Sequence, residues 1–583
     1  MEILCGLMDE SYKYQYGIDG LEDPKIFENS EVSLVSAKMD WIALQLFIKS
    51  NEDFMLSAGK RAVFSPKGQL PNIRVSCRID GIPNAIIKIY PIGFIEDDDR
   101  IYKADLLLEE EVVYVSKGSV QPVWIEIIIP KDTKPGIYKG EVKIYTQSMF
   151  DDERNIKNLN INLIVKNVVL PEPKDFNFHL DLWQHLSNIA RKHEVHLWSD
   201  EHFQVIERYV KSLADLGQKA ITIIASEIPW SGQRCFRVKN YPSDLFEYNM
   251  ARIERDEKGN YIYDFSIIER YIDMCFSYGI NKEIEVFGLI NIWTDPENGY
   301  NSIVTDYPDA IRLRYYDRAD GAYKYIRTAT EVKEYIKALE RFFIEKGLIE
   351  KVRIVADEPW DVELYNRRLN LLKEIAPSFR FKAAINHSEF IDRFKDAIDD
   401  FVPILPCVCE KWKEIEELKT QIKGRFLWYV CCWPPKPNTF ISSPLLESRL
   451  IGILTAFIGF DGFLRWNYTV WPEKPRERIS YRYPHWKAGD TNFVYPSWKG
   501  GPILSLRYKN LKRGIEDFEL ISMLKKSRKD SQMLLENLWS KVLRTKNILD
   551  FSPSCNRDIE ELYSLEYKDY QAFRTALLDA LEE

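Results

Sequence analysis

Residues 352–360 have the sequence VRIVADEPW, a mostly apolar run that ends in two adjacent carboxylates, a proline and a tryptophan. A β-strand this apolar is expected to be covered on both faces, as in a parallel sheet wrapped by helices. In barrels of this kind the reacting groups lie at the carboxyl ends of the strands. Asp357 and Glu358 are therefore the first candidates for catalysis.

On both sides of this stretch the chain alternates between β-runs and helical periods. The clearest helical stripe spans 332–343 and is closed by Gly347, and another spans 203–213 and ends at Gly217. Eight segments read as strands: 178–182, 220–224, 283–289, 352–356, 381–385, 402–405, 426–430 and 462–466. Eight strands that alternate with helices over residues 173–470 predict a (β/α)₈, TIM-like barrel.

The two ends of the chain have different patterns. Residues 1–172 contain short β-runs separated by turn clusters, such as 123–129 and 137–145, which predicts an N-terminal β-sandwich. The segment 171–174, PEPK, is expected to be a stiff linker. Residues 471–583 begin with an aromatic, proline-rich stretch and continue as helices, so we expect a C-terminal region that packs on the barrel.

Composition excludes several classes of function. The net charge is −9 and the charges are interspersed, so no basic stripe is available to track nucleic acid. The nine cysteines lack the spacing of a disulfide framework, and the N-terminus lacks the basic region of a secretory signal. No run of about 18 apolar residues predicts a membrane span. We therefore expect reduced thiols and a cytoplasmic location.

The pair Asp357 and Glu358 suits proton transfer. Where the strand breaks at Pro359, both carboxylates can turn toward one opening, and two acids this close cannot both ionise freely. One of them should keep its proton near neutral pH, as a general acid requires, and Trp360 could add an apolar wall. The alternative interpretation is a helix N-cap followed by a solvated loop acid.

Adjacent acids do not suit the usual glycosidase arrangement, in which two carboxyl groups flank the scissile bond about 5 Å apart for retention or about 6.5–9.5 Å apart for inversion. They fit a scheme in which a 2-acetamido group of the substrate attacks C1. Asp357 would then hold the acetamido nitrogen, and Glu358 would protonate the leaving oxygen.

The order of several short motifs resembles glycoside hydrolase family 123, whose barrel is followed by a domain of unknown function numbered 4091. The similar segments are 135–140 (PGIYKG), 181–185 (DLWQH), 198–203 (WSDEHF), 357–359 (DEP), 428–435 (WYVCCWPP), 447–449 (ESR), 461–466 (DGFLRW) and 513–519 (RGIEDFE). The resemblance implies retaining, substrate-assisted hydrolysis of β-N-acetylgalactosaminides. It implies that Asp357 orients the acetamido group and that Glu358 is the acid/base.

The same resemblance implies that Trp428 and Tyr429 form the wall around the N-acetyl group and that Trp466 is a floor on which the sugar stacks. Five further polar residues lie at predicted strand ends, where each could bind a sugar hydroxyl or satisfy a buried turn: Asp181, Glu227, Asn291, Asn386 and His387. Of these, Glu227 is the acid that could restore a conventional two-carboxylate mechanism.

Metal and cofactor sites are not predicted. His193 and His196 are three residues apart, which lacks the i, i+4 spacing of a helical zinc site, and there is no Cys-x-x-Cys motif. A glycine-rich phosphate loop and a Gly-x-Ser-x-Gly elbow are also absent from the sequence.

The favoured hypothesis is a hydrolase that removes β-linked N-acetylgalactosamine, or a related N-acetylhexosamine, from a glycan or glycolipid. Two alternatives stay open. One is a glycosidase that acts on a sugar without an acetamido group through separated carboxylates, and the other is a non-catalytic carbohydrate-binding protein.

Overall fold

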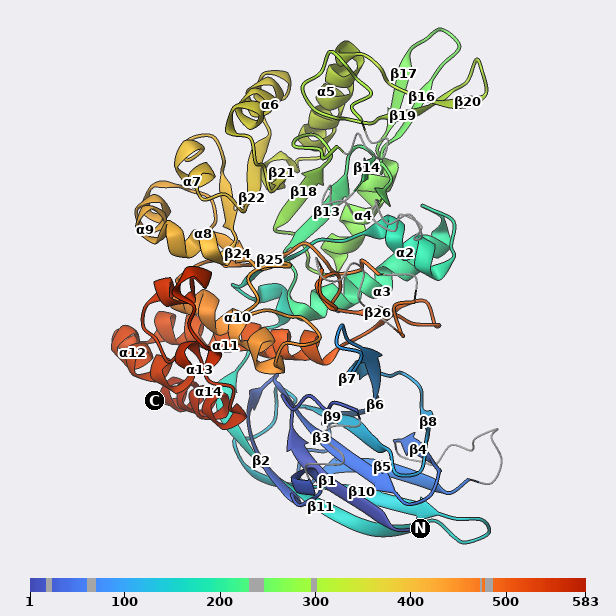
Figure 1. The fold of residues 1–583 in the computed structure, drawn as a ribbon, viewed down its shortest axis with the longest axis vertical. Coiled ribbons are helices and arrows are strands. Elements are labelled where there is room, and N and C mark those ends of the chain that lie inside the picture. Colours follow the sequence, from blue (N-terminus) through green and yellow to red (C-terminus); the bar gives the residue numbers. More distant parts are fainter. Residues whose placement is uncertain (17–23, 60–69, 230–245, 295–300, 472–473, 478–485) are drawn as a thin grey trace.

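The computed structural model describes residues 1–16, 24–59, 70–229, 246–294, 301–471, 474–477 and 486–583. It shows a mixed α/β chain with a β-rich N-terminal part and helices that dominate toward the C-terminus (Figure 1). None of the described helices combines the length and the apolar character needed to cross a bilayer.

The N-terminal part consists of two stacked β-sheets. One sheet has the order β1 (Ile3–Asp9), β3 (Trp41–Ser50), β9 (Val120–Ile128), β6 (Ile86–Glu96) and β7 (Tyr102–Leu107). The other has the order β2 (Glu31–Lys38), β11 (Arg154–Val169), β10 (Gly136–Gln147), β5 (Asn72–Ile79), β4 (Phe54–Ala58) and β8 (Val112–Val115). Every second residue of β10 is buried from Gly140 to Thr146, which is the alternation of a strand with one face on the core.

All eight segments predicted as strands between residues 178 and 466 are strands. They are β12 (His179–Leu182), β13 (Ala220–Ile224), β18 (Glu283–Phe287), β21 (Val352–Asp357), β22 (Arg380–Ile385), β23 (Asp400–Pro403), β24 (Leu427–Tyr429) and β25 (Gly462–Arg465). They form a five-stranded parallel sheet, β13-β18-β21-β22-β23, and a three-stranded parallel sheet, β12-β25-β24. Isolated parallel bridges join the two sheets at both edges: Leu180 with Gln218, Phe401 with Phe426, and Ile404 with Tyr429.

Helices cover these strands as the apolar stripes predict. Helix α3 (Asp200–Leu216) begins at Ser199, whose side chain accepts a hydrogen bond from the His202 backbone, and ends at Gly217 with a φ of 87°. Helix α5 (Ala329–Glu345) buries five residues of the predicted stripe, and only Phe342 of the stripe is partly buried. The buried five are Val332, Tyr335, Ile336, Leu339 and Phe343. The other helices here are α2 (Leu186–His193), α4 (Ser266–Ser277), α6 (Val362–Ile375), α7 (Glu389–Arg393), α8 (Leu405–Glu410) and α9 (Trp412–Gln421).

Long connections after β13 and β18 form structure that the sequence analysis did not predict. Short strands β17 (Tyr261–Asp264), β16 (Arg252–Arg255), β19 (Arg314–Asp317) and β20 (Ala322–Tyr325) make a four-stranded sheet, and β14 (Ile228–Pro229) pairs with β15 (Phe246–Glu247). The parallel pairing of β16 with β19 joins segments about sixty residues apart, so the local pattern of neither one reveals it.

The C-terminal part packs tightly on the last helix of the preceding part: α11 (Leu506–Ser527) lies against α10 (Leu445–Phe457), which connects β24 to β25. A Cβ placed on Gly452 would lie 1.9 Å from the carbonyl oxygen of Gly514, so the two backbones are in direct contact there. This part also contains two short strands, β26 (Tyr495–Pro496) and β27 (Pro502–Ile503), and three further helices, α12 (Ser531–Val542), α13 (Ile559–Leu562) and α14 (Tyr567–Glu582).

Buried ion pairs connect this helical part to the N-terminal sheets. Arg513 of α11 lies 3.1 Å from Glu10 and 2.8 Å from Asp40, and Arg574 of α14 lies 2.8 Å from Asp40 and 2.6 Å from Asp517. The two arginines hold the pKa of Asp40 at about 2 although burial opposes this. Removing one partner of such a buried set would leave an uncompensated charge, which is strongly destabilising.

The Gly452 contact gives a test of this packing. Gly452→Ala should lower the melting temperature, because the added methyl must force α10 away from α11 at a cost of about 1–3 kcal/mol. Thermal unfolding followed by circular dichroism measures the shift. Lys541→Ala, at an exposed position of α12, serves as the control and should leave the melting temperature nearly unchanged. An unchanged value for Gly452→Ala would contradict the backbone contact.

Candidate functional site

The chain leaves β21 sharply at the acid pair. Glu358 has a φ of 44°, a left-handed conformation that is uncommon for a residue other than glycine, and Pro359 follows it. The Glu358 backbone N–H still donates to the carbonyl of Ala384 on β22 at 3.0 Å, so the turn is fixed to the neighbouring strand. In this turn Asp357 is half-buried and Glu358 is buried.

Side chains from two other strand ends hold the Glu358 carboxyl group. The Tyr429 hydroxyl, from β24, donates to Oε1 at 2.6 Å, and Nδ2 of Asn386, just past β22, donates to Oε2 at 3.0 Å. Burial raises the pKa of Glu358, the Tyr429 hydrogen bond opposes that rise, and the charge of Asp490 adds to it. Three of the predicted site residues therefore meet at one point.

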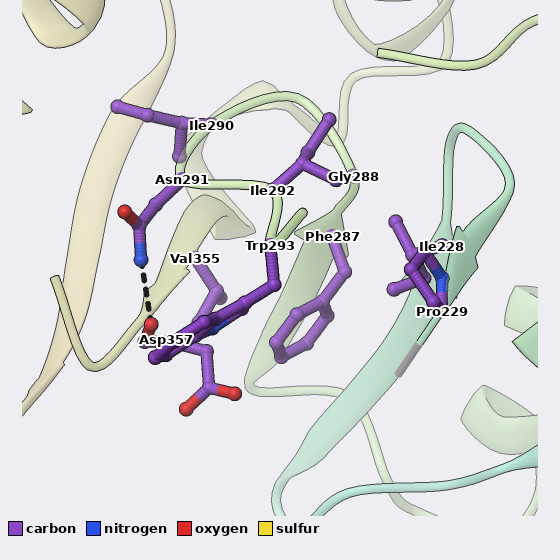
Figure 2. Close-up of a pocket in the computed structure, with 10 residues that line it drawn as sticks. All are labelled: Ile228, Pro229, Phe287, Gly288, Ile290, Asn291, Ile292, Trp293, Val355 and Asp357. Carbon is purple, nitrogen blue, oxygen red and sulfur yellow. Dashed lines mark hydrogen bonds between the residues drawn. The ribbon is translucent and has the colours of Figure 1, made fainter. Parts of the chain in front are cut away.

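Within the part of the chain that the structure describes, no cation compensates the Asp357 carboxylate. In the described ranges no lysine or arginine forms an ion pair with it, and burial followed by the charge of Glu358 raises its pKa well above the usual value. The Asp357 carbonyl accepts a hydrogen bond from Nδ2 of Asn291 at 2.6 Å. Figure 2 shows that the carboxylate points away from that bond, toward the side where the rings of Trp293 and Phe287 lie.

An apolar cavity opens next to Asp357 (Figure 2). Its lining comes from β14, β18, β21 and the segment after β18: Ile228, Pro229, Phe287, Gly288, Ile290, Asn291, Ile292, Trp293, Val355 and Asp357. Nε1 of Trp293 is buried and has no hydrogen-bond partner among the described residues. Trp293 was not predicted as a site residue, because it lies six residues past the end of β18 in a connection without periodicity.

A second residue that the sequence analysis missed is Asp490, which lies between β25 and α11. Its Oδ1 accepts from Nη2 of Arg465 at 2.8 Å and from Nε1 of Trp466 at 3.4 Å, while Nη1 of Arg465 donates to the carbonyl of Val430 at 2.8 Å. Burial raises the pKa of Asp490 to about 6. The carboxylate thus fixes the indole of Trp466 and lies close enough to Glu358 to act on its pKa.

Trp428 does not join this group. Consecutive side chains of a strand point to opposite faces, so Tyr429 faces Glu358 while Trp428 faces outward. The Trp428 indole is fully buried, donates to Oγ1 of Thr455 on α10 at 2.8 Å, and packs edge-on against Phe463 with ring centroids 5.0 Å apart. The expected pocket wall at this residue is instead part of the contact between β24 and α10.

Asp181 lies in a buried ionic cluster. Nζ of Lys382 is 2.5 Å from Asp181, 2.7 Å from Glu283 and 2.8 Å from Glu285. Oxygens of the three acids lie within 4.8 Å of one another, which suits a cation, and the lysine ammonium occupies that position. The side chain of Asp181 is therefore bound to Lys382 in the buried space between the strands.

The described contacts of Glu227 and His387 are made with residues other than the acid pair. Glu227 pairs with Nε of Arg314 at 2.7 Å and accepts from the Tyr325 hydroxyl at 2.6 Å, so the acid required by the two-carboxylate alternative is held by the β19–β20 hairpin. His387 is exposed, and its carbonyl accepts from the backbone of Phe390 at the start of α7.

The histidines near α2 face different partners. Nε2 of His193 lies 2.7 Å from the Tyr209 hydroxyl, and Nδ1 of His202 accepts from the backbone of Trp198 at 3.1 Å. Burial lowers the pKa of His185 to about 3 and those of His193 and His202 to about 4, so all three rings are neutral at pH 7.

Two family models match the chain. The model described as the catalytic domain of glycoside hydrolase 123 matches residues 183–524, which is more than half of the chain, and the model of the glycoside hydrolase 123 N-terminal domain matches residues 95–146. A comparison with curated protein sequences gave no match.

Solved structures give a similar result. A family 123 glycoside hydrolase from Clostridium perfringens, studied for glycolipid glycan hydrolysis, is 18% identical and has a TM-score of 0.72, with 100% of this chain and 97% of that chain covered. This likeness shows a shared fold. A β-D-glucuronidase of Dictyoglomus thermophilum is 10% identical with a TM-score of 0.29, covering 76% of this chain and 68% of that chain, and supports no argument at that level.

The contacts of Glu358 predict opposite effects for two substitutions. Tyr429→Phe removes a donor that stabilises the carboxylate and should raise the pKa of Glu358, whereas Asp490→Asn removes a nearby negative charge and should lower it. A hydrogen bond to a charged group contributes about 1.5–3 kcal/mol, so the shift in Tyr429→Phe should be of the order of one pH unit.

Carboxyl ¹³C NMR titration of glutamate-labelled protein measures these shifts, with the Glu358 signal assigned from Glu358→Gln. His387→Ala, at the exposed position past β22, should leave the titration unchanged. Shifts of the same sign in Tyr429→Phe and Asp490→Asn would contradict the arrangement described above.

Proposed function

The chain belongs to glycoside hydrolase family 123 and is a glycoside hydrolase, and we propose that it removes a terminal β-linked N-acetylgalactosamine, or a related N-acetylhexosamine, by substrate-assisted retaining catalysis. One observation carries this proposal. Asp357 forms no ion pair with the described lysines and arginines and lies next to an apolar cavity, and the adjacent Glu358 accepts hydrogen bonds from Tyr429 and Asn386. Asp357 is thus placed to accept the N–H of a substrate amide, and Glu358 is placed to donate a proton.

In the first step the acetamido carbonyl oxygen attacks C1 and the glycosidic bond breaks. Glu358 gives its proton to the leaving oxygen, and burial favours this role because it raises the pKa of Glu358 above the usual value. Asp357 accepts the acetamido N–H and stabilises the positive charge that develops on the oxazolinium ring. In the second step Glu358 takes a proton from water, which attacks C1 and reopens the ring, so the configuration is retained.

The apolar cavity supports the same sugar. An acetamido group presents a methyl group beside its N–H, and the rings of Phe287 and Trp293 together with Val355 surround the position next to Asp357 (Figure 2). Burying a methyl group against such a wall is favourable by about 0.8 kcal/mol. A sugar with a plain hydroxyl at C2 would leave this wall unfilled and would lack the internal nucleophile.

Other residues have supporting roles in this proposal. Trp466 stacks on the sugar ring and is oriented by Asp490, Tyr429 and Asn386 orient Glu358, and Asn291 fixes the backbone of Asp357. Asp181, Glu227 and Trp428 are engaged elsewhere, so they have no part in it.

We also propose that the eight parallel strands are a (β/α)₈ barrel over residues 173–470, between a sandwich at 1–172 and a C-terminal region at 471–583. The strand order and the bridges at both edges support a closed ring. The catalytic-domain match extends to residue 524, which supports a C-terminal region built onto the barrel.

Free thiols, including Cys431 and Cys432 with sulfur atoms 3.8 Å apart, support a reducing, cytoplasmic setting.

Substitution of the acid pair tests the assigned roles. On aryl N-acetyl-β-galactosaminides, Glu358→Gln should lower kcat/KM about 10²–10⁴-fold when the leaving group is poor, because general acid catalysis contributes that much. The loss should be small for a dinitrophenyl leaving group, which departs without a proton. Asp357→Asn should reduce both rates to a similar extent, since it acts on the attacking amide.

Thr420→Ala, on the exposed side of α9, is the matched control and should retain full activity. The corresponding aryl β-galactosides should be almost inert, and the thiazoline analogue of the intermediate should inhibit competitively. Equal turnover of galactosides, or full activity of Glu358→Gln on poor leaving groups, would refute the mechanism.

A further inference from the structure

A short hairpin between β25 and α11 is unusually well braced for its size. β26 and β27 pair antiparallel, and within the turn Ser497 N–H donates to the carbonyl of Gly501 at 2.8 Å while Ser497 Oγ accepts from the backbones of Lys499 and Gly501. Helix α3 adds support from below: Arg208 donates to the Lys499 carbonyl, and the Tyr209 hydroxyl donates to the Gly501 carbonyl at 3.2 Å.

This rigid turn presents an indole ring to solvent. Trp498 is 88% exposed, more than any other large apolar side chain that the structure describes. The Arg476 guanidinium carbon lies 5.5 Å from the ring centroid and leaves most of the ring open. A fixed turn loses little conformational freedom when a ligand stacks on its ring, so the geometry is preorganised for binding.

Trp498 forms one wall of a cleft. The other walls come from the end of α2, from residues 474–477 and from the start of the hairpin: Arg191, Lys192, Glu194, Lys474, Pro475, Arg476, Glu477, Pro496 and Ser497. None of these residues belongs to the Asp357–Glu358 group. Figure 1 shows α2 and β26 near one another on the same side of the molecule.

Charge in this cleft is locally matched. Arg476 pairs with Glu110 at 2.9 Å, Lys474 with Glu477 at 3.2 Å, and Arg191 with Glu247 at 4.0 Å. A cleft whose cations are matched by acids has little net field to attract an anion. It does offer hydrogen-bond donors and acceptors around an apolar ring, and Nη1 of Arg476 is buried without a partner among the described residues.

We propose that this cleft is a second sugar-binding site, distinct from the catalytic pair, that takes a neutral oligosaccharide. The C–H face of a sugar ring would stack on Trp498, and its hydroxyls would hydrogen-bond to Arg476, Glu194 and Glu477. A neutral glycan needs hydrogen-bond donors and acceptors and no strong field from unpaired charges. The lining offers both kinds of group, and its cations Arg191, Lys474 and Arg476 are each paired with an acid. Its role is to hold the chain of a glycan while the terminal sugar is processed elsewhere.

The test uses chitotetraose as the neutral probe and a sulfated heparin tetrasaccharide as the anionic one. Full-length protein labelled with 5-fluorotryptophan gives a ¹⁹F signal for Trp498, which Trp498→Phe assigns. Chitotetraose should shift that signal in a saturable way, also when the thiazoline is present. The heparin fragment should shift it much less. This readout does not depend on hydrolysis, so it separates this site from the proposed activity.

Calorimetry in the Glu358→Gln background, with the thiazoline present, provides the affinity. Trp498→Ala should weaken chitotetraose binding at least tenfold, which corresponds to about 1.4 kcal/mol. It should leave hydrolysis of aryl substrates unchanged. Tyr323→Ala, which removes another highly exposed aromatic ring on the β19–β20 hairpin, should bind as the parent does.

Three results would overturn the proposal. The first is a Trp498 signal that does not move at millimolar chitotetraose, and the second is a larger response to the sulfated probe than to the neutral one. Equal weakening by Trp498→Ala and Tyr323→Ala would likewise reject the cleft as the binding site.

Discussion

The repulsion between two neighbouring carboxylates in a largely buried position is the constraint on which the rest of the site depends. Asp357 and Glu358 are adjacent in sequence and burial raises the pKa of both, so the doubly ionised pair is unfavourable. An arginine beside them would relieve the repulsion and remove the proton that catalysis requires. Among the described contacts of Glu358, the phenol of Tyr429 and the amide of Asn386 orient its carboxyl group, and both are neutral.

The described cations on the neighbouring strands are bound to other acids. Lys382 pairs with a cluster of three buried acids, and Arg353 pairs with Asp400 at 2.5 Å toward the other end of the strands. Arg465 is bound to Asp490 and to the carbonyl of Val430 after β24. Because each of these charges has its own partner, the Asp357 carboxylate is left to compensate charge that arises on a substrate.

Much of this arrangement follows from local sequence. The strand at 352–357, the eight β-runs and the helices at 200–216 and 329–345 are confirmed, because apolar period and capping residues act over short distances. Asp490 and Trp293 could not be predicted in this way, since they reach the site through long connections. Trp428 shows a different error: motif proximity suggested a pocket residue, whereas strand alternation turns its side chain toward α10.

The most direct test of the account is the dependence of the rate on the nucleophilicity of the substrate's own amide. A series of aryl β-galactosaminides with N-acetyl, N-fluoroacetyl, N-difluoroacetyl and N-trifluoroacetyl groups keeps the sugar constant and weakens the carbonyl oxygen stepwise. If that oxygen attacks C1, kcat/KM must fall steeply and in order along the series. A rate that stays level across the four substrates would show that a protein carboxylate or water attacks instead, and the central claim would be wrong.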